Sequence, residues 1–193
     1  CTPTLLKFDV DTPAQTLTYA GAPPISDQRP RFREIFCGLI NQSSEAQQRR
    51  IQCEDYLWRL NDEKQGDKLS QPLPMHDASL RIILVTGAFG ECFPKMGMPY
   101  ADAAARLEKL GYRIDTLVVG GRSSSSYNAA MIAKTVDGLE LKATERLILL
   151  GYSKGATDIL HFLVDYPEIA KKVTALLSVA GVINGTPLAD KFA

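Results

Sequence analysis

The sequence predicts an α/β fold in which helices cover both faces of a mostly parallel sheet. From residue 80 onward, apolar runs of strand length alternate with segments of helical periodicity. Runs that are apolar throughout are typical of strands buried on both faces, and helix-length connections between them favour parallel pairing. We therefore divide the chain into an extension of residues 1–79, which packs on the core, and a core of residues 80–193.

The extension contains a strand pattern followed by two helical segments. Leu6, Phe8 and Val10 alternate with charged residues, which indicates an extended strand or a hairpin. Residues 30–65 show helical periodicity on both sides of a polar turn at residues 41–47, and they predict an antiparallel pair of helices. A polar connector that contains prolines then leads to residue 80.

The core elements alternate along the chain. Strands are expected at residues 80–88, 113–121, 145–151 and 172–182, and helices at residues 99–112, 127–141 and 156–167. Gly111 stops the first helix, and the third helix ends before Pro167. The last serine of the run 123–126 is expected to cap the second helix, because a serine hydroxyl satisfies a free N–H there.

Charge and hydropathy exclude several classes of partner. The chain has 22 Lys plus Arg residues and 22 Asp plus Glu residues, so its formal net charge is zero. No net field would draw it to nucleic acid or to an acidic lipid surface, and a neutral partner is expected. No apolar run reaches the roughly 18 residues that a transmembrane helix needs. We expect no metal and no cofactor, since the cysteines and histidines lack metal-ligand spacing.

Two of the four cysteines are expected to form a disulfide. Cys37 and Cys53 lie in the two predicted helices of residues 30–65, and an antiparallel pair of helices would bring them together. An exported protein would keep this bridge oxidised, whereas two buried free thiols are the alternative for a cytosolic chain.

The sequence begins with Cys1 and not with methionine. A leading cysteine resembles the lipid-modified first residue of mature bacterial lipoproteins, and the alternative is an arbitrary cut in a longer chain. The first interpretation places the protein in a bacterial envelope, in the periplasm or on the outer membrane through a lipid anchor. The second leaves the cytoplasm open.

The segment Leu149-Leu150-Gly151-Tyr152-Ser153-Lys154-Gly155-Ala156 raises a chemical question, because a serine stands between two glycines directly after a strand. In a parallel sheet, ligands bind at the carboxyl ends of strands. The spacing Gly-x-Ser-x-Gly allows a sharp turn from strand to helix that exposes the hydroxyl of Ser153. The pattern favours Ser153 as a nucleophile over a small residue in a tight turn.

These motifs resemble the α/β-hydrolase superfamily, specifically its bacterial lipase and esterase-like members. The elbow GYSKG matches the nucleophile motif, the segment LVTGAFGECF at residues 84–93 stands where the first oxyanion loop follows a strand, and SVAGVINGTPLAD at residues 178–190 is similar to a later lipase segment. The resemblance implies Ser153 as nucleophile and the backbone N–H groups of Lys154 and of Ala88 or Phe89 as oxyanion donors. The sequence departs from the family pattern at Thr86-Gly87, where relatives usually carry His-Gly.

The resemblance leaves the acid and the base open. α/β-Hydrolases run nucleophile, acid and then histidine, so the core is expected to be incomplete and to continue beyond residue 193. Asp190 is a candidate acid in a variant layout. His161 lies too far along the following helix to act as the base, and His76 precedes the first core strand. The side chain of Lys154 is expected to be a surface cation.

Two functions follow from these motifs. The first is a serine hydrolase that acts through an acyl-enzyme on a neutral acyl or lipid ester, with the acid and histidine supplied by the C-terminal portion of the same protein. The second is a non-catalytic α/β-hydrolase-like envelope protein that keeps the elbow for folding and binds a ligand or partner.

Overall fold

The computed structural model describes residues 25–65, 79–88, 100–109, 111–183 and 185–186. The chain divides into two compact units, residues 1–73 and residues 74–193. The strand expected near Leu6, the loop that contains His76, and Cys1, Phe89, Cys92 and Asp190 lie outside the described residues. That the extension packs on the core stays a prediction.

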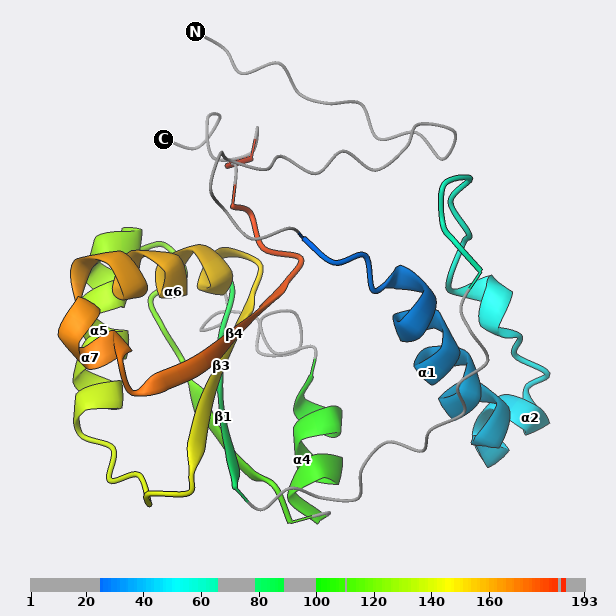
Figure 1. Cartoon of the computed structure of the whole chain (residues 1–193), viewed down its shortest axis with the longest axis horizontal. Coiled ribbons are helices and arrows are strands. Elements are labelled where there is room, and N and C mark those ends of the chain that lie inside the picture. The colour runs from blue at the N-terminus through cyan, green and yellow to red at the C-terminus, as the bar shows by residue number, and fades with distance from the viewer. Residues whose placement is uncertain (1–24, 66–78, 89–99, 110, 184, 187–193) are drawn as a thin grey trace, which may run out of the picture. The chain divides into compact units, whose positions relative to one another are not determined.

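A four-stranded parallel sheet forms the centre of the second unit (Figure 1). Its strands are β1 (Leu80–Val85), β2 (Arg113–Leu117), β3 (Arg146–Tyr152) and β4 (Val173–Val179), in the order β2-β1-β3-β4. All three pairings are parallel. The predicted fold class is therefore confirmed, and the carboxyl ends of all four strands meet at one edge of the sheet.

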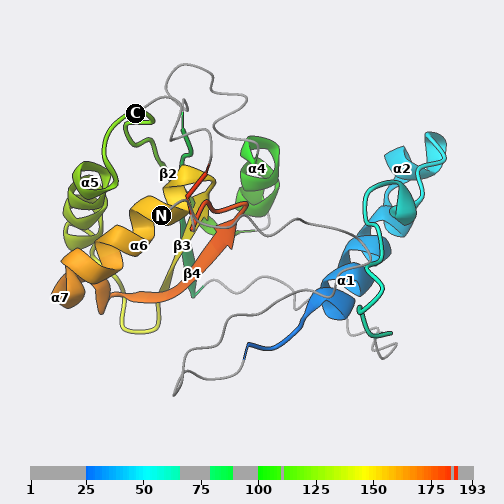
Figure 2. The same cartoon turned by 90° about the horizontal axis from the view of Figure 1, so that it is seen from above.

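Helices cover both faces of this sheet. Figure 2 shows α5 (Ser125–Asp137) and α6 (Lys154–Asp165) on one face and α4 (Ala101–Lys109) on the other. A short helix, α7 (Pro167–Ala170), begins two residues after the end of α6. It starts with a proline, which suits the first helical position because an N–H there would have no partner within the helix. Gly111 ends α4 with a φ of 90°, a conformation that suits glycine.

One predicted cap is wrong by two residues. The side chain of Ser124 accepts a hydrogen bond from the N–H of Tyr127, at 3.2 Å, and α5 begins at Ser125. The last serine of the run, Ser126, lies inside the helix. Any of four consecutive serines could cap by residue type, so the sequence alone did not select among them.

The apolar core of the second unit lies between the sheet and the pair α5 and α6. Its fully buried large side chains are Ile83, Val85, Val119, Ile132, Val136, Leu147, Leu149, Ile159 and Phe162. Strand β4 differs from the prediction that each strand is covered on both faces, since Leu177 is 47% exposed. β4 is an edge strand among the four described strands, and an apolar run does not distinguish an edge from a centre.

Among its described residues, 25–65, the first unit contains one long helix and not the predicted pair. Helix α1 (Arg29–Gln42) is followed by the short α2 (Ser44–Gln48) and by the 3₁₀ turn η1 (Cys53–Asp55). The second helix, expected after the polar turn at residues 41–47 and around Cys53, is wrong, because residues 56–65 follow η1 without regular structure.

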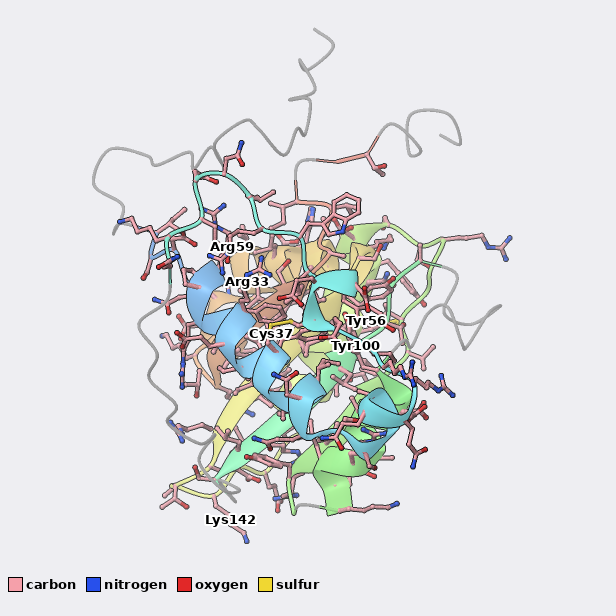
Figure 3. All side chains as sticks on the ribbon, turned by 90° about the vertical axis from the view of Figure 1, so that its right-hand side faces the viewer. Arg33, Cys37, Tyr56, Arg59, Tyr100 and Lys142 are labelled. Atoms are coloured by element: carbon pink, nitrogen blue, oxygen red, sulfur yellow. A yellow bond between two sulfur atoms is a disulfide. The ribbon has the colours of Figure 1, made fainter. Side chains whose placement is uncertain are left out.

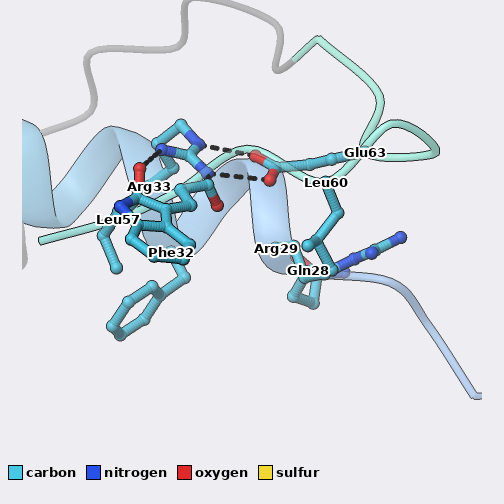
Figure 4. Close-up of a pocket in the computed structure, with 8 residues that line it drawn as sticks. Gln28, Arg29, Phe32, Arg33, Leu57, Leu60 and Glu63 are labelled. Carbon is cyan, nitrogen blue, oxygen red and sulfur yellow. Dashed lines mark hydrogen bonds and ion pairs between the residues drawn. The ribbon is translucent and has the colours of Figure 1, made fainter. Parts of the chain in front are cut away.

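The Arg33 guanidinium explains this correction (Figure 4). It donates to both carboxylate oxygens of Glu63, at 2.6 and 2.8 Å, and to the carbonyls of Leu57 and Trp58, at 2.8 and 2.9 Å. In a helix these carbonyls would bond to N–H groups of the next turn. Arg33 therefore holds residues 57–63 against α1 in an open conformation.

A disulfide joins Cys37 on α1 to Cys53 at the start of η1, with their Cα atoms 5.2 Å apart (Figure 3). The structure pairs the two cysteines that the sequence suggested. The partner of α1 is a 3₁₀ turn and not a second long helix, so the geometry that brings the sulfurs together differs from the expected helical pair.

No helix among the described residues is long and apolar enough to cross a bilayer. Helix α1 has 14 residues, whereas a span needs about 20.

We expect the disulfide to be detectable by mass and to stabilise the first unit. Alkylation without reduction should leave Cys37 and Cys53 unmodified, and alkylation after reduction should modify both. Since the bridge closes a sequence separation of 16 residues, Cys53→Ser should lower the free energy of unfolding of this unit by about 3 kcal/mol. Equal alkylation with and without reduction would exclude the bridge.

We also expect the first unit to lose stability in acid through Glu63. The hydrogen bonds from Arg33 hold the pKa of Glu63 below its usual value of 4.5. A carboxylate whose pKa is lowered on folding stabilises fully above the unfolded pKa, and this stabilisation is lost as the pH falls through the folded pKa. Urea unfolding followed by the fluorescence of Trp58, the sole tryptophan in the chain, should show a midpoint that falls below about pH 4.5.

The matched variants are Glu63→Gln and Glu45→Gln. Glu63→Gln should be less stable than the unaltered chain at pH 7 and should show a shallower fall in acid. Glu45 is exposed and pairs with Arg49 at 3.2 Å, so Glu45→Gln should leave the dependence of stability on pH nearly unchanged. Identical profiles for the two variants would contradict this role of Glu63.

Candidate active site

Ser153 lies at the sharp turn between β3 and α6, at the carboxyl end of a central strand. Its φ is 52° and its ψ is −122°, values that a residue other than glycine rarely adopts. Such a conformation costs on the order of 1–3 kcal/mol and persists only where surrounding contacts enforce it. The residue is partly exposed.

The two glycines that flank Ser153 enforce the turn by close contact. A Cβ atom at Gly151 would lie 2.4 Å from the Cα of Ala156, and a Cβ at Gly155 would lie 2.5 Å from the carbonyl oxygen of Thr86. Both neighbours are backbone atoms that have no rotamer to change. The first turn of α6 therefore approaches β3 and the end of β1 at a distance that only glycine allows.

The segment after β1 passes directly beside Ser153. A Cβ atom at Gly87 would lie 3.1 Å from the Cβ of Ser153 and 3.0 Å from the carbonyl oxygen of Tyr152. Ala88 follows and is partly exposed, whereas Phe89 lies outside the described residues. The structure thus brings the start of the predicted oxyanion loop to the predicted nucleophile.

The segment after β4 closes the other side of the elbow. The N–H of Ser153 donates to the carbonyl of Val179, at 2.9 Å, so this amide is already occupied. A Cβ at Gly181 would lie 2.8 Å from the Cβ of Ala156. The N–H of Lys154 belongs to the first turn of α6, where amides have no acceptor within the helix.

The side chain of Lys154 is not the free surface cation that we expected. Its Nζ donates to both carboxylate oxygens of Asp158, at 2.7 and 2.9 Å, and the side chain of Asp158 is fully buried. The spacing of four residues on one helix was visible in the sequence. That Asp158 faces the interior was not, and this orientation decides where the lysine goes.

Asp158 and Asn128 join the elbow helix to the end of β2. The amide nitrogen of Asn128 donates to Asp158, at 2.8 Å, and to the carbonyl of Gly120, at 2.9 Å. The amide oxygen of Asn128 accepts from the N–H of Gly120, at 3.1 Å. Asn128 is fully buried, so these bonds replace the water that its amide would otherwise hold. Sequence analysis missed both residues.

His161 is the only histidine among the described residues, and it is not placed as a base for Ser153. It lies on α6, where its imidazole is 46% exposed and lies 3.8 Å from the carboxylate of Asp165. The other candidates, His76 and Asp190, lie outside the described residues. The described part of the chain therefore offers a serine and amide donors without a histidine base.

An aromatic pair stands next to the elbow. The rings of Tyr100 and Tyr152 meet edge to face, with their centroids 5.8 Å apart. Burial raises the pKa of the Tyr100 phenol above its usual value, and the neighbouring Tyr152 adds to this shift. The Tyr100 phenol therefore stays protonated at neutral pH, and the two aromatic rings with their hydroxyl groups form one side of the elbow.

The first unit has a hollow of about 340 Å³, which does not resemble a reaction site. Its polar lining consists of Gln28, Arg29, Arg33 and Glu63. Arg33 and Glu63 pair with each other (Figure 4), and Arg29 pairs with Asp27 and Asp62. Its remaining lining is mostly apolar, from Phe32, Leu57, Trp58 and Leu60. In the described ranges no three His, Cys, Asp or Glu side chains come together as metal ligands.

Comparisons with solved structures identify the fold. The chain is similar to the crystal structure of the metagenomic carboxyl esterase MGS0156, with 32% sequence identity over 95% of this chain and a TM-score of 0.73. The core has an α/β-hydrolase-like fold. It is also similar to the Bacillus licheniformis lipase BlEst2 in mature form, at 24% identity over 65% of this chain with a TM-score of 0.48, which is too low to carry an argument.

The chain spans 55% of the length of the carboxyl esterase and 49% of that of the lipase. No protein-family model matches the sequence, and no curated protein matches it significantly.

The close contact at Gly155 predicts a large effect of one methyl group. Gly155→Ala would place a Cβ 2.5 Å from the Thr86 carbonyl and should destabilise the second unit by about 2–3 kcal/mol. Gly138→Ala is the matched control, because Gly138 has a φ of −72° and a Cβ there would meet its nearest atom at 3.5 Å. Thermal unfolding of the two variants measures the difference, and equal melting temperatures would contradict the packing described for the elbow.

Proposed function

We propose that this chain carries the nucleophile and the oxyanion donors of a serine ester hydrolase. The observation that carries the proposal is the strained conformation of Ser153 at the carboxyl end of a central strand, since strain of this kind is kept where a function needs it. The similarity to a carboxyl esterase at 32% identity over 95% of the chain supports the same reaction class.

In this reaction the Oγ of Ser153 attacks the carbonyl carbon of the ester, and its proton passes to a general base. The electron pair of the C=O bond moves to the oxygen, which the N–H groups of Lys154 and of Ala88 or Phe89 stabilise. Collapse of the intermediate expels the alcohol, which takes up the proton, and leaves an acyl-enzyme. Water then attacks the acyl-enzyme and releases the acid and Ser153.

The proposal assigns the general base and its acid to sequence beyond residue 193. His161 is turned to solvent beside Asp165. The carboxyl esterase to which this chain is similar is longer, and the chain spans 55% of its length. Asp190 remains a weaker candidate for the acid.

The substrate class follows from the surroundings of Ser153. The chain has no net charge, and the Tyr100–Tyr152 pair offers an apolar surface beside the elbow. A neutral acyl or lipid ester fits these surroundings better than an ionised substrate does.

The disulfide supports a location outside the cytoplasm. A bridge between Cys37 and Cys53 persists where the surroundings are oxidising. We therefore include export to an oxidising compartment, such as a bacterial envelope, in the proposal.

We expect the complete protein that contains this chain to hydrolyse short p-nitrophenyl esters and to be labelled by a fluorophosphonate at Ser153. Ser153→Ala should abolish labelling and lower kcat by at least about 10³-fold. Because the proposal places the base beyond residue 193, the 193-residue chain alone should turn over these esters very slowly or not at all. Labelling is read by mass spectrometry of the peptide that contains residue 153.

Ser126→Ala is the matched control, because Ser126 is an exposed serine on α5. This variant should keep full activity and labelling. Equal activity of Ser153→Ala and the unaltered protein would remove Ser153 from the reaction. A folded complete protein that hydrolyses no ester and takes up no label would favour the ligand-binding alternative.

A further inference from the structure

A continuous chain of hydrogen bonds runs behind the elbow, from the segment after β1 to the first turn of α6. It starts at the buried Thr86, whose Oγ1 accepts from the N–H of Val119, at 3.2 Å. Gly120 follows in sequence and is held through both its N–H and its carbonyl by Asn128. Asn128 then donates to Asp158, which binds Lys154.

The two ends of this chain lie at or close to the two proposed oxyanion donors. Thr86 lies two residues before Ala88 on the same segment, and Lys154 itself supplies the second amide. An oxyanion hole works only when its donors are held at fixed positions before the reaction, because reorganisation would cost the energy they supply. This chain of hydrogen bonds links the two segments that carry the proposed oxyanion donors.

The placement of Lys154 and Asp158 contradicts what favours an isolated helix. A cation in the first turn opposes the helix dipole, and lysine placed four residues before an acid is the weaker orientation of such a pair. Asp158 is also fully buried, which carries a desolvation cost that a partner only offsets. Local rules broken together at one place are expected at a functional site.

The geometry points to Thr86, Asn128 and Asp158 as positioning residues of the oxyanion hole, an inference that rests on the proposed function. They contact neither the substrate nor the reacting atoms. Thr86 fixes the segment that leads to Ala88 by tying it to the end of β2. Asn128 and Asp158 fix the first turn of α6, through Lys154, to that same strand end.

Thr86→Val is the decisive variant, because valine keeps the shape of threonine and removes the hydroxyl that accepts from Val119. In the complete protein we expect kcat for a p-nitrophenyl ester to fall about 10-fold or more, with KM changed less than about twofold. Thr86→Ser restores the hydroxyl and should recover most of kcat. The rate of fluorophosphonate labelling at saturating reagent should follow kcat.

Two controls separate positioning from general weakening of the fold. Thr135→Val removes a hydroxyl that donates to the carbonyl of Met131, at 3.0 Å, within α5, and it should leave kcat unchanged. Asp158→Asn should lower kcat from the other end of the chain, whereas Asp165→Asn, on the exposed side of α6, should not. All rates are measured where circular dichroism shows each variant to be folded, and per folded molecule.

A kcat for Thr86→Val equal to that of Thr135→Val would overturn the inference. A loss that Thr86→Ser fails to recover would also overturn it, since the hydroxyl would then not be the cause. Neither outcome touches the proposed function, which is tested by Ser153→Ala. If Ser153→Ala keeps full activity, the proposed function falls and the inference with it.

Discussion

The second unit depends on one close approach, between the carbonyl groups that end β1 and the first turn of α6. A Cβ at Gly155 would lie 2.6 Å from the carbonyl oxygen of Val85 and 2.5 Å from that of Thr86. Because Gly155 has no side chain, α6 can start directly against the end of β1. The elbow, the segment that carries Ala88, and the packing of Ile159 and Phe162 on the sheet all follow from the position at which α6 begins.

Each unit uses a polar side chain to hold irregular backbone in place, the buried Asn128 in one and the partly buried Arg33 in the other. In the second unit, Asn128 holds both backbone groups of Gly120 where β2 has ended. In the first unit, Arg33 holds the carbonyls of Leu57 and Trp58. Irregular segments near an apolar interior carry N–H and C=O groups that need partners, and a fixed side chain supplies them where a strand or helix does not.

The sequence predicted the alternation of strands and helices in the core because the two periodicities differ and the connections have helical length. It also predicted the elbow, since few segments place two glycines around a serine directly after an apolar run. It failed where the answer depends on a distant residue. Residues 49–60 have helical spacing, yet Arg33 binds the carbonyls that a helix would use. Lys154 was expected to be a surface cation, because the burial of its partner Asp158 depends on how α6 packs on the sheet.

The strained backbone of Ser153 also affects which substitutions selection would favour at this position. At a φ of 52° glycine would relieve the strain, and every other residue would retain it. A library selected for thermal stability alone would therefore enrich glycine at position 153, whereas selection for the proposed reaction would keep serine. In a descendant of this sequence, glycine at position 153 would thus indicate selection for stability, and serine would indicate selection for the proposed reaction.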